Sequence, residues 1–150
     1  MHNSWQNLTV IKNKVNEIIE KKQLKNSPSI IVVTKKFSLE KIKLLLDNGH
    51  SHFGENKIQE AEEKWILAKQ NYKNVQLHMI GKLQSNKAKK AVKIFDYIHA
   101  LDSFKLASKI SQYEKELNKK IKIFIQVNLG QEDQKSGILL KNLDNFYTYC

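Results

Sequence analysis

The chain contains very little cysteine, proline and glycine, and it contains no arginine. Of its 150 residues, one is cysteine, one is proline and five are glycine. The single cysteine, Cys150, excludes an internal disulfide framework and a zinc site built from a cysteine cluster. Scarce glycine and proline, together with an apolar share of 41%, exclude a disordered chain and indicate one globular domain.

Long apolar runs are also missing. No run approaches the ~18 residues of a membrane span. The first fifteen residues are polar and periodic, unlike a secretory signal. We therefore expect a cytoplasmic protein without a membrane partner.

The chain is strongly basic, but lysine is the only basic residue type that contributes to this charge. The formal net charge is +11, and all 26 basic residues are lysine. A basic chain favours polyanions, yet arginine supplies the bidentate contacts that readers of nucleic acids prefer. A basic nucleic-acid-binding domain is therefore a remote alternative, and we expect no specific nucleic acid. That alternative predicts steeply salt-dependent binding.

Hydrophobic patterning predicts strands that alternate with helices. Strands are expected near residues 30–34, 51–54, 75–80, 96–100 and 121–128, and helices over 4–22, 39–48, 58–68, from about 84, over 106–117 and from 139. Such alternation with short loops indicates an α/β fold with a parallel sheet, either doubly wound or a (β/α)8 TIM-type barrel. Five units are too few to close a barrel of ~250 residues. Since the chain also ends inside an apparent helix, we expect one domain over 1–150 that is truncated at its C-terminus.

The first predicted strand ends in two lysines. Its unbroken β-branched run, 30–33, is typical of a strand that is buried on both faces, and Lys35 and Lys36 then point to opposite sides. Parallel α/β proteins place their chemistry at the C-terminal ends of such strands. Burial and a nearby cation both favour the neutral, nucleophilic form of a lysine amine. Lys35 is a candidate Schiff-base lysine, and two solvated lysines are the ordinary alternative.

Polar residues also follow the other four predicted strands, as the side chains of a lined pocket would. They are Glu55 and Asn56, then His78, then His99 and Asp102, then Gln126, Asn128 and Lys135. The ordinary alternatives are a helix N-cap at Asn56 and core histidines with satisfied hydrogen bonds at His78 and His99. No G-x-G-x-x-G, P-loop, H-E-x-x-H or G-x-S-x-G motif is present, so we predict neither catalytic residues nor a metal site.

Several short motifs in a fixed order resemble one known family. They are Val33-Thr34-Lys35, Phe53-Gly54-Glu55-Asn56, His78-Met79-Ile80-Gly81, Leu83-Gln84-Ser85-Asn86-Lys87, Gln126-Val127-Asn128 and Lys135-Ser136-Gly137. The set is similar to that of the pyridoxal phosphate homeostasis proteins, whose barrel resembles the alanine racemase N-terminal domain. The resemblance spans about residues 8–140.

The resemblance implies a cofactor and its site. It implies that Lys35 holds pyridoxal 5′-phosphate (PLP) as a Schiff base, and that Asn56, His78 and Lys135 lie near the cofactor. Lys36 departs from the family, where many members carry threonine. The family's C-terminal third, with its phosphate-binding loops and an arginine near the pyridine nitrogen, has no counterpart here.

The resemblance also implies a role. It implies intracellular PLP homeostasis by a carrier that is not an efficient enzyme, with PLP-dependent apoenzymes as candidate partners. A PLP-dependent racemase or decarboxylase of the same barrel class is the alternative. Product formation from free amino acids would separate the two.

Overall fold

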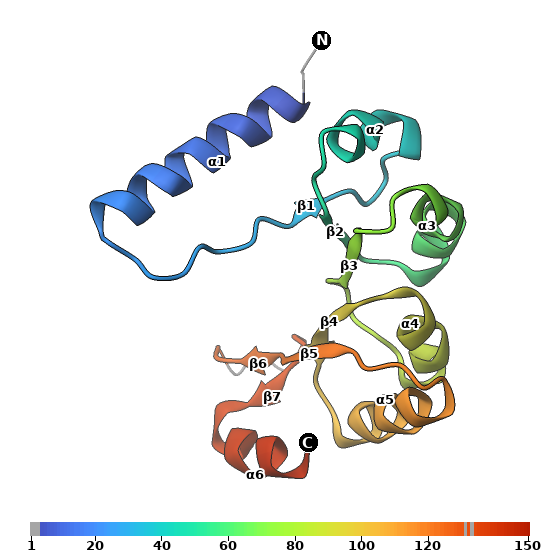
Figure 1. Ribbon diagram of the computed structural model, residues 1–150. Coiled ribbons are helices and arrows are strands. Elements are labelled where there is room, and N and C mark those ends of the chain that lie inside the picture. Colours follow the sequence, from blue (N-terminus) through green and yellow to red (C-terminus); the bar gives the residue numbers. More distant parts are fainter. Residues whose placement is uncertain (1–3, 131, 133) are drawn as a thin grey trace.

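A computed structural model of the protein describes residues 4–130, 132 and 134–150. The chain starts with helix α1 (Ser4–Lys21) and then alternates strands with helices (Figure 1). The strands are β1 (Val32–Val33), β2 (His52–Glu55), β3 (Gln76–Met79), β4 (Tyr97–Leu101) and β5 (Lys122–Ile125). The helices between them are α2 (Leu39–Asp47), α3 (Ile58–Asn71), the short η1 (Ser85–Lys87) that leads into α4 (Ala88–Ile94), and α5 (Phe104–Glu116). The last elements are β6 (Val127–Asn128), β7 (Ile138–Leu139), η2 (Leu140–Asn142) and α6 (Leu143–Tyr149).

The five main strands form one parallel sheet in the order β1-β2-β3-β4-β5. Each strand pairs with the next one along the chain, so all five C-terminal ends lie at one edge. This arrangement confirms the α/β class and the sequential order of strands that the pattern predicts. All five strands lie where the sequence predicts them, with ends that differ by one to three residues.

The prediction of one continuous strand over 121–128 is wrong. Pairing between β4 and β5 becomes irregular after Ile98 and ends at Leu101 and Ile125. The next residue, Gln126, donates its side-chain N–H to the carbonyl of Ser136 at 3.1 Å. The Gln126 backbone N–H still donates to the Leu101 carbonyl of β4, and the Gln126 carbonyl accepts from the Ile138 N–H, both at 2.8 Å. After this residue β6 pairs with β7 in a separate two-stranded sheet.

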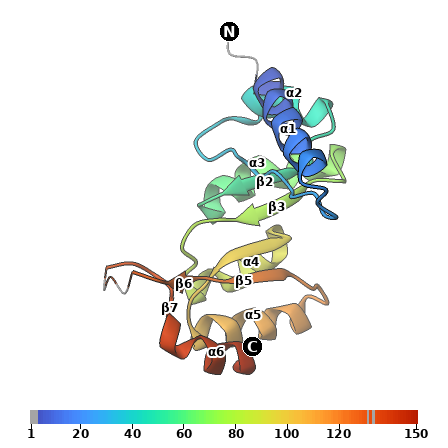
Figure 2. The same ribbon diagram turned by 90° about the vertical axis from the view of Figure 1, so that its left-hand side faces the viewer.

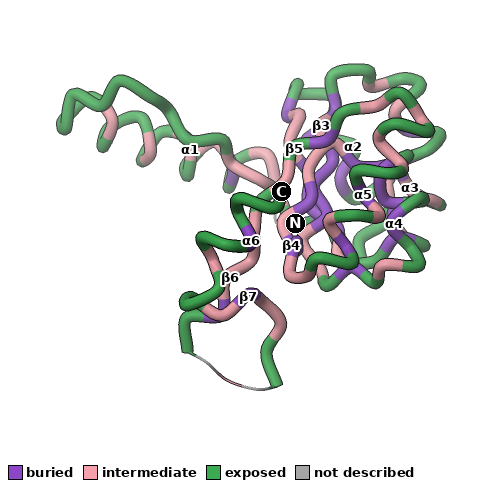
Figure 3. Tube along the Cα trace, turned by 90° about the horizontal axis from the view of Figure 1, so that it is seen from below, coloured by how far each residue is buried: buried purple, intermediate pink, exposed green. Residues whose placement is uncertain are grey.

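Helices α2 to α5 cover one face of the sheet, as Figure 1 shows. The strand residues on that face form a hydrophobic core with the helices, and the purple segments in Figure 3 gather between the two layers. Phe53, Leu77 and Ile98 have no exposed surface, and Trp65 of α3 packs on Phe53 with ring centroids 4.9 Å apart. Burial of this apolar area is the main stabilising contribution to the fold.

The other face of the sheet is much less covered. Val33 and Phe124 are 44% and 52% exposed, although both lie on strands of the central sheet. Helix α1 lies away from most of the sheet in Figure 1, and Leu8 is its only buried residue. No helix in the described part of the chain has both the length and the apolar character that crossing a bilayer requires. This less covered side of the sheet, called the open face below, is therefore the region in which we look for a functional site.

Candidate functional site

Lys35 follows β1 directly and stands at the C-terminal edge of the sheet. Val33 pairs with Gly54 of β2, and Gly54 pairs with His78 of β3, so these three residues form one row on the open face. Side chains two positions apart share a face, which places Lys35 one layer further toward the C-terminal edge than this row. Lys35 is exposed, so the burial that we expected to favour its neutral amine is not provided by the described residues.

The residues on either side of Lys35 are fixed by hydrogen bonds. The Thr34 N–H donates to the Gly54 carbonyl at 2.9 Å, and the Phe37 N–H donates to the Thr34 carbonyl at 3.1 Å. Lys36 has a left-handed backbone with φ of 65°, which is uncommon for a residue with a side chain, and its N–H donates to the Glu60 carboxylate. The lysine therefore sits in a turn that the neighbouring elements hold on both sides.

A buried carboxylate organises the helix-facing side of this turn. Glu55 is fully buried at the end of β2, and its Oε1 accepts hydrogen bonds from the Thr34 hydroxyl at 2.7 Å and from the Trp65 indole at 3.1 Å. The Lys64 ammonium lies 2.8 Å from the same oxygen and 2.8 Å from the Thr34 carbonyl. Its side chain is only 7% exposed, so this is a buried ion pair. Removal of Lys64 would leave the Glu55 charge buried without an ionic partner, whereas removal of Glu55 would leave Lys64 only its longer pair with Glu60 at 3.5 Å.

Asn56 lies at the same edge, one residue beyond β2. It is not the N-cap of α3, because that position belongs to Lys57. Gly81, just beyond β3, packs against the Asn56 backbone so closely that a Cβ at this glycine would lie 2.3 Å from the Asn56 carbonyl oxygen. Only glycine allows this approach, which is how the ends of β2 and β3 come together.

The two most distinctive motifs of the sequence meet around one cavity. The segments that begin at Asn56 and at Lys82 line a cavity of about 480 Å³. Its lining residues are Asn56, Lys57, Ile58, Gln59, Met79, Lys82, Leu83, Gln84 and Lys87. The two motifs are separated in the sequence, but they form the walls of the same cavity at the C-terminal edge of the sheet.

Three histidines form a hydrogen-bonded chain across the open face. His52 Nδ1 lies 2.9 Å from His78 Nε2, and His78 Nδ1 lies 3.0 Å from His99 Nε2. Tyr97 stacks on the His78 ring with centroids 4.1 Å apart, and Phe124 stacks on His99 at 4.6 Å. A neutral His78 satisfies both bonds by donating from one nitrogen and accepting at the other.

This arrangement makes protonation of His78 unfavourable. Burial is the main cause and the neighbouring His99 and His52 add to it, so the pKa of His78 falls from 6.5 to about 4 despite the opposing effect of Asp96. Burial also lowers the pKa of His99. Both ring nitrogens of His78 have protein partners, which agrees with a core histidine. Its predicted position beside the cofactor stays a prediction.

Lys135 lies in the segment between β6 and β7 and is not packed against Lys35. Its side chain is 62% exposed and pairs with Glu132, with 2.5 Å between Nζ and Oε1. Figure 2 shows that this segment projects from the same side of the sheet as the C-terminal ends of β2 and β3. The Lys135 carbonyl accepts from the Asn128 amide at 3.4 Å, so β6 fixes the base of the segment.

The structure thus brings Lys35, Asn56 and His78 to neighbouring strands, whereas Lys135 lies on a separate segment on the same side. Sequence reasoning gave no role to Lys64, and it missed the hydrogen bonds of His52. The spacing of Glu60 and Lys64, four residues apart on a helix, was the available signal for one contact. The remaining contacts join different strands, and their partners depend on strand register.

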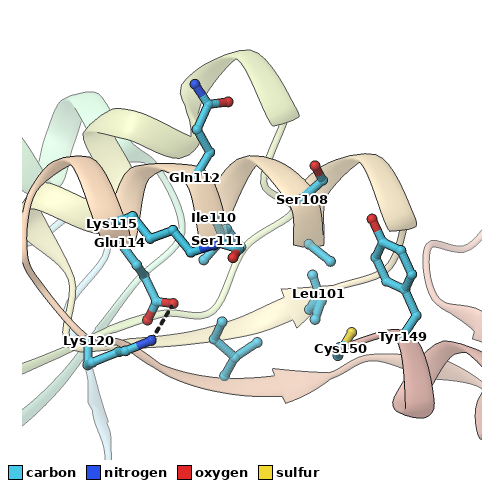
Figure 4. A pocket seen from close by; sticks show the side chains of 12 residues that line it. Leu101, Ser108, Ile110, Ser111, Gln112, Glu114, Lys115, Lys120, Tyr149 and Cys150 are labelled. Carbon is cyan, nitrogen blue, oxygen red and sulfur yellow. Dashed lines mark ion pairs between the residues drawn. The ribbon is translucent and has the colours of Figure 1, made fainter.

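A second groove lies between α5 and the sheet. Figure 4 shows the groove between α5, the sheet and the C-terminal residues Tyr149 and Cys150. Its volume is about 650 Å³. Glu114 and Lys120 face each other there at 3.6 Å. None of the residues of the strand-end motifs lines this groove, so it does not belong to the site at the C-terminal edge.

Comparison with known families identifies the class of protein. Residues 7–150 match the model of the family described as "Alanine racemase, N-terminal domain", and the chain belongs to this family. The family explains the parallel sheet, which is part of a barrel, and the largely uncovered face, which is the barrel interior.

The relatives found among curated proteins narrow the class further. A protein named "Pyridoxal phosphate homeostasis protein" from Buchnera aphidicola subsp. Schizaphis graminum is 35% identical over 146 residues, which cover 95% of this chain and 62% of the relative. A Synechocystis protein of the same name is 40% identical over 111 residues, which cover 74% of this chain and 50% of the relative. The chain thus spans between half and two thirds of the length of these relatives.

Solved structures agree with this assignment. PipY of Synechococcus elongatus PCC7942 without PLP aligns with a TM-score of 0.74 at 33% identity, covering 90% of this chain and 64% of PipY. The same protein with PLP bound gives a TM-score of 0.70 at 32% identity and covers 91% of this chain and 65% of PipY. An alanine racemase of Clostridium difficile, at 17% identity, shares the fold with a TM-score of 0.64, covering 91% of this chain and 36% of the racemase.

The donor groups at the strand ends fit the aldehyde end of PLP. Lys35 supplies an accessible primary amine at the edge of the sheet, and Asn56 supplies an amide on the adjacent strand. No group of three or more metal-binding side chains occurs in the described ranges, 4–130, 132 and 134–150. An accessible primary amine is a group that can react with a carbonyl.

Proposed function

We propose that this chain binds PLP and serves intracellular PLP homeostasis, with Lys35 as the residue that holds the cofactor. The observation that carries the proposal is the position of Lys35: an exposed amine at the C-terminal end of the first strand, beside the open interior face. The relatives named for PLP homeostasis and the PLP-bound structure of PipY support it. Residues 1–150 would act together as one PLP-binding domain.

The chemistry requires little beyond a correctly placed amine. Lys35 would hold PLP through its amine, and the aldehyde of bound PLP would supply Schiff-base chemistry, in which the amine nitrogen replaces the carbonyl oxygen and water is released. Asn56 would orient the bound group through its amide. His78 would contribute a neutral ring held by His52 and His99, since the pKa of His78 is lowered to about 4. Lys135 would approach from the segment after β6 once its pairing with Glu132 opens.

A carrier role fits the described residues better than catalysis. The two ring nitrogens of His78 already bind other histidines, and Lys64 is committed to Glu55, so neither side chain is available as an acid or base opposite the cofactor. Such a carrier would work in the cytoplasm and deliver PLP to PLP-dependent apoenzymes. A racemase would instead turn over free amino acids, and the absence of any product while PLP stays bound would distinguish the carrier from it.

The direct test is chemical trapping. The chain is mixed with PLP, the absorbance of the Schiff base is recorded, and borohydride then reduces the C=N bond to a stable secondary amine. Peptide mass spectrometry should find the adduct on Lys35. Lys35→Ala should abolish this adduct, whereas Lys36→Ala should leave most of it in place. An adduct on Lys36, or one spread evenly over many lysines, would overturn the assignment.

A further inference from the structure

Two lysines stand side by side at the end of β1, and only the local turn distinguishes them. Lys35 and Lys36 are both exposed, so accessibility does not select either one. Lys36, however, lines a cavity of about 450 Å³ on the side of α3, together with Glu60, Glu63 and Lys64. Lys35 does not line that cavity. The turn therefore directs Lys36 toward α3 and leaves Lys35 on its other side.

One carboxylate on α3 holds this turn. Glu60 accepts the backbone N–H of Lys36, the residue with the left-handed φ of 65°. The same oxygen lies 3.5 Å from Lys64 Nζ, which in turn donates to the Thr34 carbonyl at 2.8 Å. Glu60 thus fixes the residue after Lys35, and Lys64 fixes the residue before it.

We infer that Glu60, acting with Lys64, is a positioning residue that selects Lys35 over Lys36 as the amine that reacts with an aldehyde. The inference rests on the proposed function, since it assumes that a lysine of this turn binds PLP. Adjacent residues of an extended chain point to opposite sides, so a shift of the turn by one residue would exchange the positions of the two side chains. The hydrogen bond to Glu60 opposes that shift, because it stabilises a left-handed backbone at Lys36 that is intrinsically unfavourable for a residue with a side chain.

The chain offers matched variants to test this. Glu60→Ala removes the acceptor of the Lys36 N–H, whereas Glu60→Gln keeps an oxygen in the same place without the charge. Glu63→Ala is the control, because Glu63 is an exposed carboxylate on the same helix, and no hydrogen bond or ion pair among the described residues joins it to the turn. The side chain of Glu60 is 27% exposed, so its removal leaves no fully buried cavity.

The measurement is the ratio of reduced PLP adducts on Lys35 and Lys36 in the 150-residue chain, assigned by peptide fragmentation. We expect a large excess on Lys35 in the unaltered chain. Glu60→Ala should lower the ratio about tenfold, in line with the loss of a hydrogen bond to a charged acceptor. Glu60→Gln should retain most of the selectivity, and Glu63→Ala should retain all of it.

Each outcome decides one of the two proposals. If the unaltered chain is labelled on Lys35 and Glu60→Ala leaves the ratio unchanged, the positioning role is refuted and the proposed function stands. If the unaltered chain is labelled elsewhere, both fail. Label spread over all lysines in Glu60→Ala would indicate unfolding. Glu60→Asp then replaces it, because the shorter side chain cannot reach the Lys36 N–H and should show the same loss of selectivity.

Discussion

The two faces of the parallel sheet differ in almost every property. The face toward α2–α5 carries Phe53 and Ile98, neither of which has any exposed surface. The opposite face carries His78 in a hydrogen-bonded chain of histidines, and Phe124 at its edge is 52% exposed. The first face forms the hydrophobic core with the helices, whereas the second is lined by aromatic and imidazole rings that no helix covers in the described residues. The difference teaches that packing against helices is confined to one side of these strands, so substitutions on the two sides should have different effects on stability.

Truncation of an aromatic side chain on each face gives the largest expected contrast. Phe53→Ala removes a fully buried ring that packs on Trp65 and should lower the free energy of unfolding by about 3–5 kcal/mol. Phe124→Ala removes a half-exposed ring and should lower it by less than about 1 kcal/mol. Urea unfolding measures both variants. Similar losses would show that the open face is packed after all.

The buried ion pair should make the next largest contribution. Lys64→Met removes the ammonium beside Glu55 and leaves a carboxylate that is entirely enclosed. We expect a loss of about 3 kcal/mol in urea unfolding, because an uncompensated buried charge is costly.

A double variant distinguishes the effect of an unpaired buried charge from the effect of lost side-chain packing. Glu55→Gln combined with Lys64→Met removes both charges and keeps an oxygen for the Thr34 hydroxyl. It should recover most of the lost stability. If the double variant is no more stable than Lys64→Met alone, the ion pair is not the source of the effect.

On the open face, acid should act through the histidine chain. The pKa of His78 is about 4 in the folded chain and 6.5 in its unperturbed state, so the unfolded chain binds more protons between these values. Stability contributed by the neutral ring is present above about pH 6.5 and is lost as pH falls toward 4. The loss should be on the order of 1–3 kcal/mol, measured by urea unfolding as a function of pH.

Replacement of the central histidine tests the source of this pH dependence. His78→Gln keeps a donor and an acceptor but does not titrate in this range, so the unfolding free energy should fall less between pH 6.5 and 4. An unchanged slope would assign the effect to other groups.

The smallest effect on stability is expected at the proposed site itself. Lys35→Ala alters an exposed side chain at the end of a strand, so the free energy of unfolding should change by no more than about 0.5 kcal/mol. The same substitution should abolish the PLP adduct. A large loss of stability would mean that Lys35 serves the packed face, and the contrast between the two faces would then fail.

Periodicity alone determined most of the fold. The apolar residues of α3, Ile58, Ala61, Trp65 and Ala68, repeat at helical spacing, and all four are buried. The polar residues after each strand also identified the C-terminal edge, since parallel strands bring their ends together. Lys35 and Asn56 could therefore be predicted to follow strands that end at the same edge of the sheet.

Only the tertiary structure decided how these residues are held. The division of residues 121–128 into β5 and β6 follows a change of pairing partner, from β4 to β7, which no local pattern contains. The exposure of Lys35, the pairing of Glu55 with Lys64 and the line of histidines depend on strand register and on the covering helix. Sequence periodicity specifies which side of a strand or helix a residue occupies, but its partner is set by long-range packing between elements far apart in the chain.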